Sequence, residues 1–357
     1  MKIHLMKVLI ACNRNSYKNP YVATLADGLI AMGVDITCSL DEFWSNSCNY
    51  DVIHIQWPNL LVKKNDSNCS LLKKTLTNIR KNGIPIVVTL HNLIPHYCNE
   101  ECVYDAYKVV YESADYIIHM GEISIGELHK QMPYLKAKNF VIPHHTYDTL
   151  YCMNVDKGLA KKKLGIPNTK KCVLSFGSFR DDEERRILTS LSDACRDFYF
   201  LAPGFYRGEI FRKNIKLGFS ALLKTIKYSL IAWRHRIHIC HRYVSDEMLP
   251  YYMAAADVLL ISRVKILNSG NVSMAMLAGV PIVGPNVGNV GWILNKSGNR
   301  TFDVNHLENL PTLVRESLKD PRIGMSNKNY SEKFLKTMIV ARQVMDVYEK
   351  IVKKDRK

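Results

Sequence analysis

The sequence predicts an α/β protein of two domains, each a parallel sheet covered by helices on both faces. Three observations support this fold class. The chain has 357 residues, more than one hydrophobic core usually holds, so two domains of roughly 150 to 200 residues are expected. Short apolar runs alternate with amphipathic stretches along the chain, which is the pattern of parallel sheets. This alternation stops once near the middle and then starts again.

The first half carries six short apolar runs of the kind that form buried strands. The expected strands are residues 7–12, 34–39, 52–56, 86–90, 116–120 and 139–142. Helical patterns lie between them, at residues 21–32, 70–81, 101–112 and 124–131. We assign the resulting Rossmann-like domain to residues 1–150.

A polar, lysine-rich stretch follows and ends in Gly165-Ile166-Pro167-Asn168, so residues 151–170 are predicted to be a linker. The second Rossmann-like domain is assigned to residues 171–330. Its expected strands are residues 172–176, 198–202, 237–241, 258–261 and 281–283. A final amphipathic helix is expected within 331–357. Two such domains are expected to face each other across a cleft at the carboxyl ends of their sheets.

The chain is strongly basic, with 49 Lys and Arg against 33 Asp and Glu and a formal charge of +16. A charge of this size indicates an anionic partner: nucleic acid, a phospholipid surface or a phosphorylated substrate. The sequence has no helix-turn-helix, RNP-type or zinc-finger pattern, and no stacking aromatic residues interleaved regularly with basic ones. We therefore expect no nucleic acid partner.

One basic segment, from Phe211 to Arg236, has the pattern of an amphipathic helix. Its apolar residues recur at three- and four-residue spacing, and its basic residues fall largely off that stripe. Such a helix can lie in the interface of an anionic membrane. A core-packed helix with a solvated basic face fits the same pattern. No segment of the sequence reaches the ~18 apolar residues that a membrane span needs.

Ten cysteines are scattered without paired spacing, and no signal peptide precedes the first expected strand. We therefore expect reduced thiols and a cytoplasmic protein, peripheral on the inner face of the plasma membrane. Cys98 and Cys102 lie one helical turn apart with His96 nearby. A fourth metal ligand cannot be named there, so no metal site is expected.

The first strand of the second half leads into Phe176-Gly177-Ser178-Phe179-Arg180. A glycine at a strand end allows a phosphate to approach the backbone closely. Arg180 then offers a planar donor fork suited to a pyrophosphate. An ordinary turn with a surface arginine is the alternative.

A second motif, Lys265 to Asn271, leads into a helical pattern. Ser and Asn are good helix N-caps, and the free amides and positive dipole end of a helix bind anions. Lys265 adds a point charge to the same place, and a capped core helix is the alternative. The predicted phosphate-binding residues are Gly177, Ser178, Arg180, Lys265, Asn268, Ser269, Gly270 and Asn271.

Two histidines, His91 and His96, follow the strand expected at 86–90. Just past a strand end, either can hydrogen-bond a ligand or accept a proton. Polar and aromatic residues at other strand and helix ends form a further candidate group: Asn19, Tyr21, Trp57 and His144. A purely structural role is the alternative for each.

In the order and spacing of these motifs, the sequence resembles bacterial GT-B glycosyltransferases of the group 1, family 4-like type that assemble polysaccharides. The matching segments are residues 19–21, 51–58, 89–92, 141–144, 176–180, 244–258 and 268–281. The resemblance implies that a hexose-type sugar moves from a UDP- or GDP-linked donor onto a lipid-linked or polysaccharide acceptor. It implies donor binding by the second domain and acceptor binding by the first, with Asn19, Tyr21, Trp57 and His144 on the acceptor side.

The resemblance also implies catalysis by His91, His96 and Arg180, without a metal and with no cofactor besides the nucleotide sugar. It implies that the last helix crosses back to the first domain. A lid-like closure of the two domains would complete such a site.

The sequence departs from this family at the donor site. Many retaining members carry a pair of glutamates where this chain has Ile266 and Met274, and a basic residue where it has Glu183. The pattern resembles a branch in which donor contacts rest on Ser269 and backbone amides. Two alternatives therefore stay open: a nucleotide-sugar epimerase of the same fold, and a nucleotide-sugar-binding protein without catalytic activity.

Overall fold

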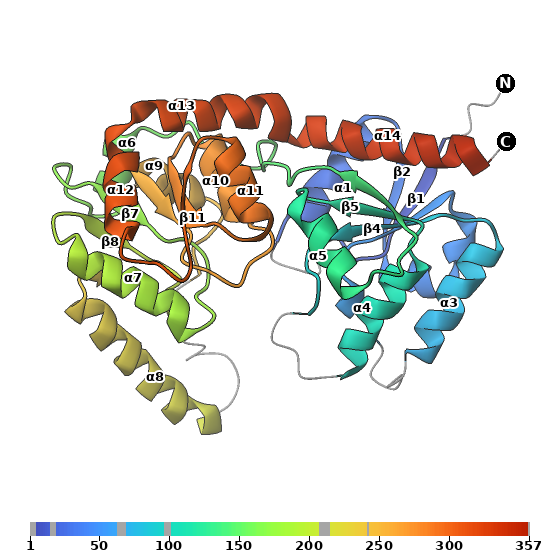
Figure 1. The fold of residues 1–357 in the computed structure, drawn as a ribbon, viewed down its shortest axis with the longest axis horizontal. Coiled ribbons are helices and arrows are strands. Elements are labelled where there is room, and N and C mark those ends of the chain that lie inside the picture. Colours follow the sequence, from blue (N-terminus) through green and yellow to red (C-terminus); the bar gives the residue numbers. More distant parts are fainter. Residues whose placement is uncertain are drawn as a thin grey trace. The chain divides into compact units, whose positions relative to one another are not determined.

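The computed structural model describes residues 5–14, 19–62, 69–95, 101–206, 215–240 and 243–355. The chain forms two compact units, each with its own sheet (Figure 1). The first unit comprises Met1–Tyr147 and Phe334–Lys357, and the second comprises Asp148–Lys333. Each unit alternates strands and helices, as the hydrophobic pattern predicts.

The sheet of the first unit has six parallel strands in the order β2-β1-β3-β4-β5-β6. The strands are β1 (Lys7–Ile10), β2 (Asp35–Cys38), β3 (Val52–Ile55), β4 (Ile86–Leu90), β5 (Tyr116–His119) and β6 (Lys138–Val141). Strand β2 lies on one side of β1, and β3 lies on the other side, so the strand order changes direction at β1. In open α/β sheets, ligands bind at such a change of direction, outside the carboxyl ends of the strands.

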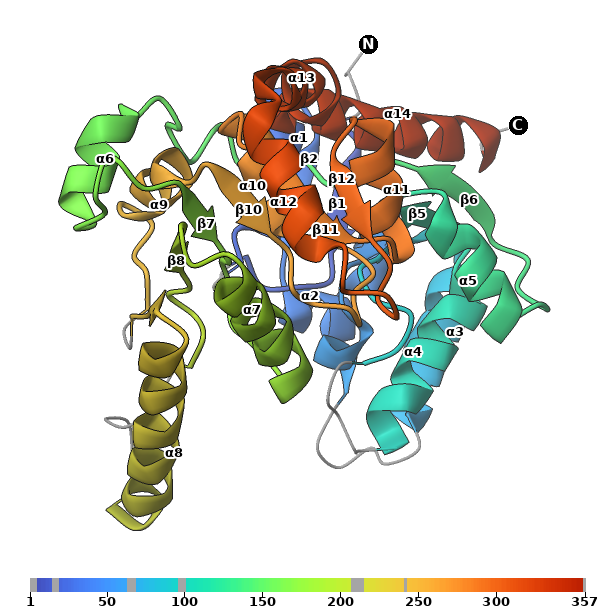
Figure 2. The same cartoon turned by 60° about the vertical axis from the view of Figure 1, so that its left-hand side comes forward.

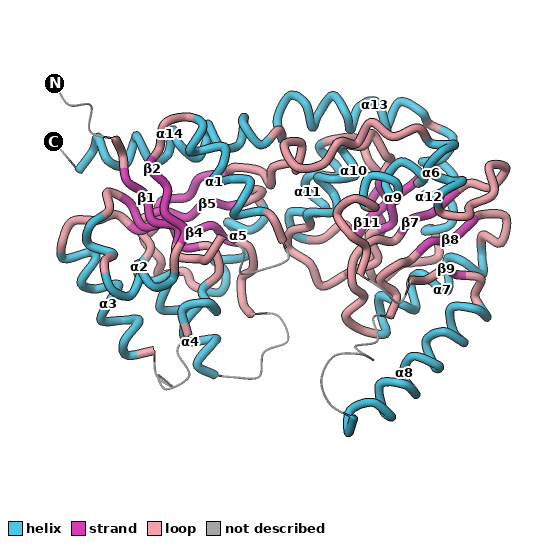
Figure 3. The backbone as a smooth tube through the Cα atoms, turned by 180° about the vertical axis from the view of Figure 1, so that it is seen from behind, coloured by secondary structure: helices cyan, strands magenta, loops and turns pink. Residues whose placement is uncertain are grey.

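The helices of the first unit include the last helix of the chain. They are α1 (Tyr21–Ala31), α2 (Leu40–Ser45), α3 (Ser70–Lys81), α4 (Glu101–Ser113), α5 (Ile123–Gln131) and α14 (Thr337–Asp355). Helix α14 packs closely on α1, because a Cβ added at Gly28 would lie 2.8 Å from the Cβ of Ala341. Figure 3 shows α14 beside α1 and the strands β1 and β2.

The sequence predicts one helix from residue 331, and the structure differs slightly there. A π-helical turn, Ser331–Leu335, precedes α14. Thr146 ties this turn to the end of the first sheet, since its backbone N–H donates to Leu335 O at 2.6 Å. Thr337 Oγ1 in turn donates to Thr146 O at 2.8 Å. These bonds bring the start of α14 next to the segment that follows β6.

The sheet of the second unit also has six parallel strands, in the order β12-β11-β10-β7-β8-β9. The strands are β7 (Cys172–Leu174), β8 (Tyr199–Leu201), β9 (Ile237–His238), β10 (Val258–Leu260), β11 (Ile282–Pro285) and β12 (Arg300–Phe302). The hydrophobic pattern predicts five of these and misses β12. That edge strand has three residues and begins with an exposed arginine, so it lacks the apolar run of a buried strand.

Eight helices of the second unit lie within the described residues: α6 (Lys157–Lys163), α7 (Asp182–Ala194), α8 (Ile215–Arg234), α9 (Leu249–Ala255), α10 (Gly270–Leu277), α11 (Gly288–Lys296), α12 (Leu310–Lys319) and α13 (Pro321–Tyr330). Helix α6 lies within the stretch that the sequence predicts to be a linker. Its Lys161 is buried and donates to Asp257 Oδ2 at 3.1 Å, so this stretch packs into the second unit.

Across the parts of the chain that the structure describes, no helix is both long enough and apolar enough to cross a membrane.

Candidate functional site

A narrow pocket in the second unit lies at the carboxyl ends of β7 and β10, where the strand order changes direction. Three segments line it: the turn after β7, the end of β10 and the start of α10. Of the predicted phosphate-binding residues, Gly177, Ser178, Ser269 and Asn271 line this pocket. The structure therefore brings the two predicted motifs together.

The turn after β7 depends on glycine and is tied to α10. Gly177 has a φ of +100°, a conformation that favours glycine. A Cβ at this position would lie 3.0 Å from Asn271 Nδ2, which donates to Phe176 O at 2.7 Å. The Asn271 side chain thus holds the turn against the first residues of α10.

Gly204, after β8, packs against the same turn and was not singled out from the sequence. A Cβ added at Gly204 would lie only 1.8 Å from Gly177 O. The backbone N–H of Phe179 also donates to Gly204 O at 3.1 Å. The turn is therefore held from two sides, by Asn271 and by Gly204.

An ion pair between the buried Glu184 and the half-buried Arg263 supports the turn as well. Glu184, at the start of α7, has a side chain that is only 4% exposed. Arg263 Nε donates to Glu184 Oε1 at 2.8 Å, and Arg263 Nη2 donates to Ser178 O at 2.5 Å. Arg263 and Glu184 both line the pocket, so the guanidinium lies at the predicted phosphate site with its charge paired to a carboxylate. Its position three residues after the buried strand β10 (Val258–Leu260) was the sequence signal that could have identified it.

Arg180 and Lys265 lie outside the pocket lining. The Arg180 side chain is exposed, while its backbone N–H donates to Glu184 Oε2 at 3.1 Å. Lys265 is 77% exposed, and its Nζ lies 3.4 Å from Glu183 Oε2. Glu183, which stands where a basic residue is usual in the family, therefore pairs with Lys265 in this chain.

The start of α10 presents backbone amides at the pocket. Ser269 occupies the N-cap position in extended conformation, but its side chain makes no capping hydrogen bond. The helix begins at Gly270, and the Val272 N–H already donates to Ser269 O at 3.2 Å. The Gly270 and Asn271 amides precede it and lie at the positive end of the helix. Asn268 is not among the residues that line the pocket, and its Oδ1 accepts a hydrogen bond from Asn289 Nδ2 at 2.9 Å.

In the first unit, a group of ring side chains lies at the carboxyl ends of β3, β4 and β6. We call it the histidine cluster, and its members are Tyr21, Trp57, His91, His144, His145 and Tyr147. The rings of Trp57 and His91 stack with centroids 4.5 Å apart. Tyr21 packs edge-on against His91 at 4.9 Å and against His144 at 4.8 Å.

Asn19 joins this cluster through hydrogen bonds. Its Oδ1 accepts from the Tyr147 hydroxyl at 3.1 Å and from the Tyr21 backbone N–H at 3.0 Å. The structure thus brings together the predicted residues Asn19, Tyr21, Trp57, His91 and His144. His96 and Cys98 lie outside the described residues.

Burial keeps His91 and His144 uncharged. It lowers the pKa of His144 to about 3. Burial also lowers the pKa of His91 well below its usual value, and repulsion from His144, His54 and His145 adds to this. At neutral pH these rings form hydrogen bonds as neutral donors and acceptors. The cluster therefore suits uncharged hydroxyl groups better than phosphates.

Among the described residues, no group of three or more His, Cys, Asp or Glu side chains is arranged to hold a metal ion.

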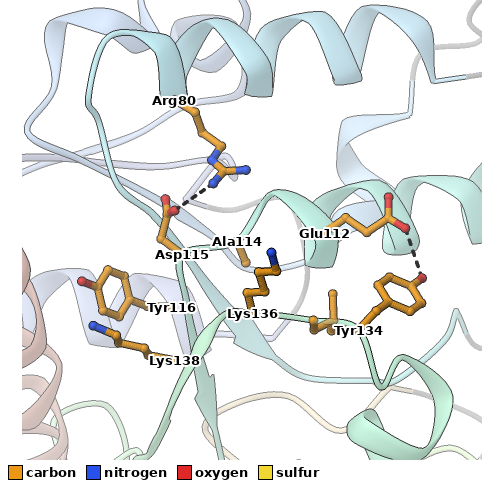
Figure 4. A pocket seen from close by; sticks show the side chains of 9 residues that line it. Arg80, Glu112, Ala114, Asp115, Tyr116, Tyr134, Lys136 and Lys138 are labelled. Carbon is orange, nitrogen blue, oxygen red and sulfur yellow. Dashed lines mark hydrogen bonds and ion pairs between the residues drawn. The ribbon is translucent and has the colours of Figure 1, made fainter.

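A larger cavity of the first unit, of about 490 Å³, lies where β5 and β6 begin (Figure 4). Arg80 lies 3.5 Å from Asp115 there, and the Tyr134 hydroxyl donates to Glu112 at 3.1 Å. This is the amino-terminal edge of the sheet, opposite to the edge where open α/β sheets bind ligands. We therefore place the candidate site at the histidine cluster.

Two six-stranded parallel sheets with interleaved helices are the architecture of the two-domain GT-B fold, and the prediction of this fold is confirmed. The homologues and structural neighbours of the chain are glycosyltransferases. No family model matches the chain.

The sequence is 22% identical over 331 residues to a GDP-mannose:glycolipid 4-beta-D-mannosyltransferase of Xanthomonas campestris pv. campestris. The match covers 88% of this chain and 86% of that relative. Sucrose-phosphate synthase from Thermosynechococcus elongatus has a similar structure, with a TM-score of 0.73 at 14% identity over 97% of this chain and 99% of that one. Anabaena HepE in complex with UDP and glucose has a TM-score of 0.68 at 14% identity, and the match covers 97% of this chain and 100% of that one. WaaG, a glycosyltransferase involved in lipopolysaccharide biosynthesis, has a TM-score of 0.62 at 12% identity. That match covers 96% of this chain and 99% of the WaaG chain.

Proposed function

We propose that this chain moves a hexose-type sugar from a nucleotide-diphosphate donor onto a lipid-linked or polysaccharide acceptor. The observation that carries the proposal is the pocket of the second unit. It combines a glycine turn, the amide end of α10 and the charge of Arg263. Backbone amides at a helix start together with an arginine are a common arrangement for binding phosphates. The names of the similar proteins agree with such a donor, because they include GDP-mannose and UDP.

In this proposal the second unit binds the donor and neutralises the diphosphate as it leaves. Charge that develops as the anomeric bond breaks is stabilised most by donors already held in place. Arg263 is held by Glu184, and the α10 amides are fixed by the helix. These groups supply positive charge without a metal ion or a further cofactor. The neutral histidine cluster of the first unit would bind hydroxyl groups of the acceptor.

Arg180 is the predicted residue whose removal tests catalysis. We expect Arg180→Ala to lower turnover by about 100-fold or more, the usual effect of losing a donor to developing negative charge. The fold should persist, because the Arg180 side chain is exposed. The measurement is transfer of labelled sugar from GDP- and UDP-linked donors to lipid-linked acceptors, with circular dichroism as the check on folding.

The matched control is Arg186→Ala, an exposed arginine of α7 outside the pocket. Wild-type turnover in Arg180→Ala would remove Arg180 from the mechanism. If the unaltered chain binds UDP or GDP but transfers to no acceptor, the non-catalytic binding protein is the better description. Conversion of a free nucleotide sugar without any acceptor would favour the epimerase.

We also propose that α8 docks the second unit on an anionic membrane surface, at the inner face of the plasma membrane. Large apolar side chains of α8 are exposed: Leu222 at 45%, Leu223 at 51%, Ile226 at 48%, Leu230 at 59% and Trp233 at 80%. Four of them share one helix face by their spacing. Figure 2 shows α8 extending away from the sheet of its unit.

The other face of α8 packs against α7. The Tyr228 hydroxyl donates to Asp182 Oδ1 at 2.9 Å, and Ala232 is 1% exposed. The apolar stripe is therefore not the face that this helix buries in its own unit. Lys224, Lys227 and Arg234 of the same helix are exposed as well. Their positive charges complement anionic lipid.

Vesicle flotation tests this docking. We expect binding to vesicles that contain phosphatidylglycerol and little binding to phosphatidylcholine alone. Each basic residue near an anionic surface contributes about 1 kcal/mol, so Lys224→Glu with Lys227→Glu should weaken binding by about tenfold or more. Trp233→Glu should also weaken it, whereas Met325→Glu on α13, another exposed apolar residue, should not. Binding that ignores anionic lipid, or that survives the lysine replacements, would refute the docking.

A further inference from the structure

Arg185, on α7, is a buried arginine that contacts the turn after β7, which we call the pocket turn (residues 176–181). It is 9% exposed, and it is not among the residues that line the pocket. A guanidinium carries five N–H donors in a fixed planar fork. Here Nη2 donates to Phe179 O at 3.1 Å, Nη1 donates to Asp181 O at 2.7 Å, and Nε donates to Phe205 O at 3.0 Å. One side chain therefore joins the segment after β7 to the segment after β8.

The charge of Arg185 is balanced by these carbonyls and by an aromatic ring more than by an acid. Its carboxylate contact is Asp182, whose Oδ1 accepts from Nη1 at 3.1 Å but whose side chain is 69% exposed. A pair with so exposed a partner contributes little. The guanidinium carbon lies 4.4 Å from the ring centre of Tyr228 on α8, which is within the range of a cation–π contact. The backbone of the pocket turn and α8 therefore set the position of this arginine.

The peptide unit between Phe179 and Arg180 is held on both sides. Its C=O accepts from Arg185, and its N–H donates to Glu184 Oε2 at 3.1 Å. The C=O and the N–H of a planar trans peptide point in opposite directions, so the two bonds together fix the orientation of the peptide plane. Loss of Arg185 would remove one of these two bonds, directly beside Arg180 and one residue from the pocket-lining Ser178.

We propose that Arg185 is a positioning residue, which holds the pocket turn in the conformation that binds the diphosphate of the donor. The inference rests on the proposed function and makes it more specific. Arg185 contacts no ligand in this proposal. It directs the partial negative charges of Phe179 O and Asp181 O at a cation within the protein. Groups that are already oriented stabilise a phosphate best, because they need no rearrangement when charge develops.

The test compares Arg185→Met with a matched control, Lys161→Met. Methionine keeps an unbranched side chain at residue 185 and removes all its donors. Lys161 is also a buried cation of the second unit, which donates to Lys170 O at 2.8 Å and to Asp257 Oδ2 at 3.1 Å. Asp257 directly precedes β10, so this contact lies at the sheet edge opposite to the pocket. Both variants are measured at a temperature at which circular dichroism shows them folded.

We expect Arg185→Met to raise the Kd for UDP or GDP by about tenfold or more, because hydrogen bonds to a charged group are among the stronger ones. The KM for the nucleotide sugar should rise in parallel, while the KM for the acceptor stays at its wild-type value. Lys161→Met should leave the Kd and both KM values unchanged. A residue that only stabilised the fold would not separate the two KM values in this way.

A second variant, Arg185→Lys, keeps the proposal testable if the methionine variant does not fold. Lysine restores the charge, but a single ammonium group cannot reproduce the three carbonyl bonds of the planar fork. Nucleotide affinity should therefore fall in this variant as well. Wild-type affinity in either folded variant of Arg185, or an equal loss in Lys161→Met, would overturn the inference.

Hydrogen exchange separates this inference from the proposed function. The Phe179 amide donates to Gly204 O and the Arg180 amide to Glu184, so both are protected while the turn is closed. Without nucleotide, Arg185→Met should speed their exchange by about tenfold or more, because the turn opens more often, and Lys161→Met should not. Unchanged exchange in Arg185→Met would refute the positioning. If the wild type binds neither UDP nor GDP but the turn loosens as expected, the positioning stands and the proposed function fails.

Discussion

Replacing Gly204 with alanine is expected to weaken nucleotide binding by the second unit and to destabilise the chain. A Cβ at this position would lie 1.8 Å from Gly177 O, 2.6 Å from Gly177 C and 3.1 Å from Ser178 N. All three atoms belong to the backbone of the pocket turn, so no side-chain rotation relieves the clash. The turn itself must move, and with it the amides and the carbonyl that Arg263 contacts.

We expect Gly204→Ala to lower the affinity for UDP or GDP by at least about tenfold. The free energy of unfolding should fall by about 3 kcal/mol, at the upper end of the usual cost of overpacking. Isothermal calorimetry and thermal unfolding measure the two effects. Gly126→Ala in α5 is the control, because nothing lies within 4 Å of the added Cβ and alanine favours helix by ~0.5–1 kcal/mol. Wild-type nucleotide affinity in Gly204→Ala would mean that this turn does not bind the donor.

The general position of both candidate groups follows from the sequence, because parallel strands bring their carboxyl ends to one edge. The motifs at Gly177 and Ser269 are 92 positions apart in the sequence. Gly177 lies just after β7, and Ser269 lies between β10 and α10, so both come to the same edge of the sheet. The same argument places Trp57, His91 and His144 together. Hydrophobic periodicity was sufficient here, since it predicts where each strand ends.

The supporting contacts could not be predicted in this way. Glu184 lies in a run of charged residues, a pattern that predicts a solvent-exposed helix start. Only the structure shows that its side chain is buried against Arg263. Gly204 has no unusual φ, so its need for glycine comes entirely from a neighbour distant in sequence.

The departures from the family pattern also acquire a physical meaning. Ile266 lines the pocket of the second unit, and Met274 is buried within α10. These apolar residues place no acid at the positions where many members have glutamate. Arg263 is the basic residue among those that line the pocket, so its replacement is a direct test of the pocket.

Arg263→Ala is expected to damage both stability and donor binding. It would leave the carboxylate of Glu184, 4% exposed, without its cation, although the Arg180 backbone N–H still donates to Glu184 Oε2 at 3.1 Å. Removing one partner of a buried pair typically costs about 3–5 kcal/mol. Nucleotide affinity should fall by at least about tenfold, because the pocket loses its fixed positive charge.

Arg315→Ala is the matched control. Arg315 forms a two-point pair with Asp197, with both N–O distances at 2.8 Å, but these side chains are 41% and 56% exposed. Exposed pairs contribute about 0–1 kcal/mol. This variant should therefore unfold close to the wild-type temperature and bind nucleotide normally.

A double variant, Arg263→Met with Glu184→Met, separates the two effects of Arg263. Replacing both members of a buried pair with apolar residues is often neutral or stabilising, so much of the lost stability should return. Nucleotide binding should stay weak, because the charge at the pocket is still absent. If the double variant instead recovers donor affinity, Arg263 only compensates Glu184, and the diphosphate must be bound by the α10 amides and Arg180.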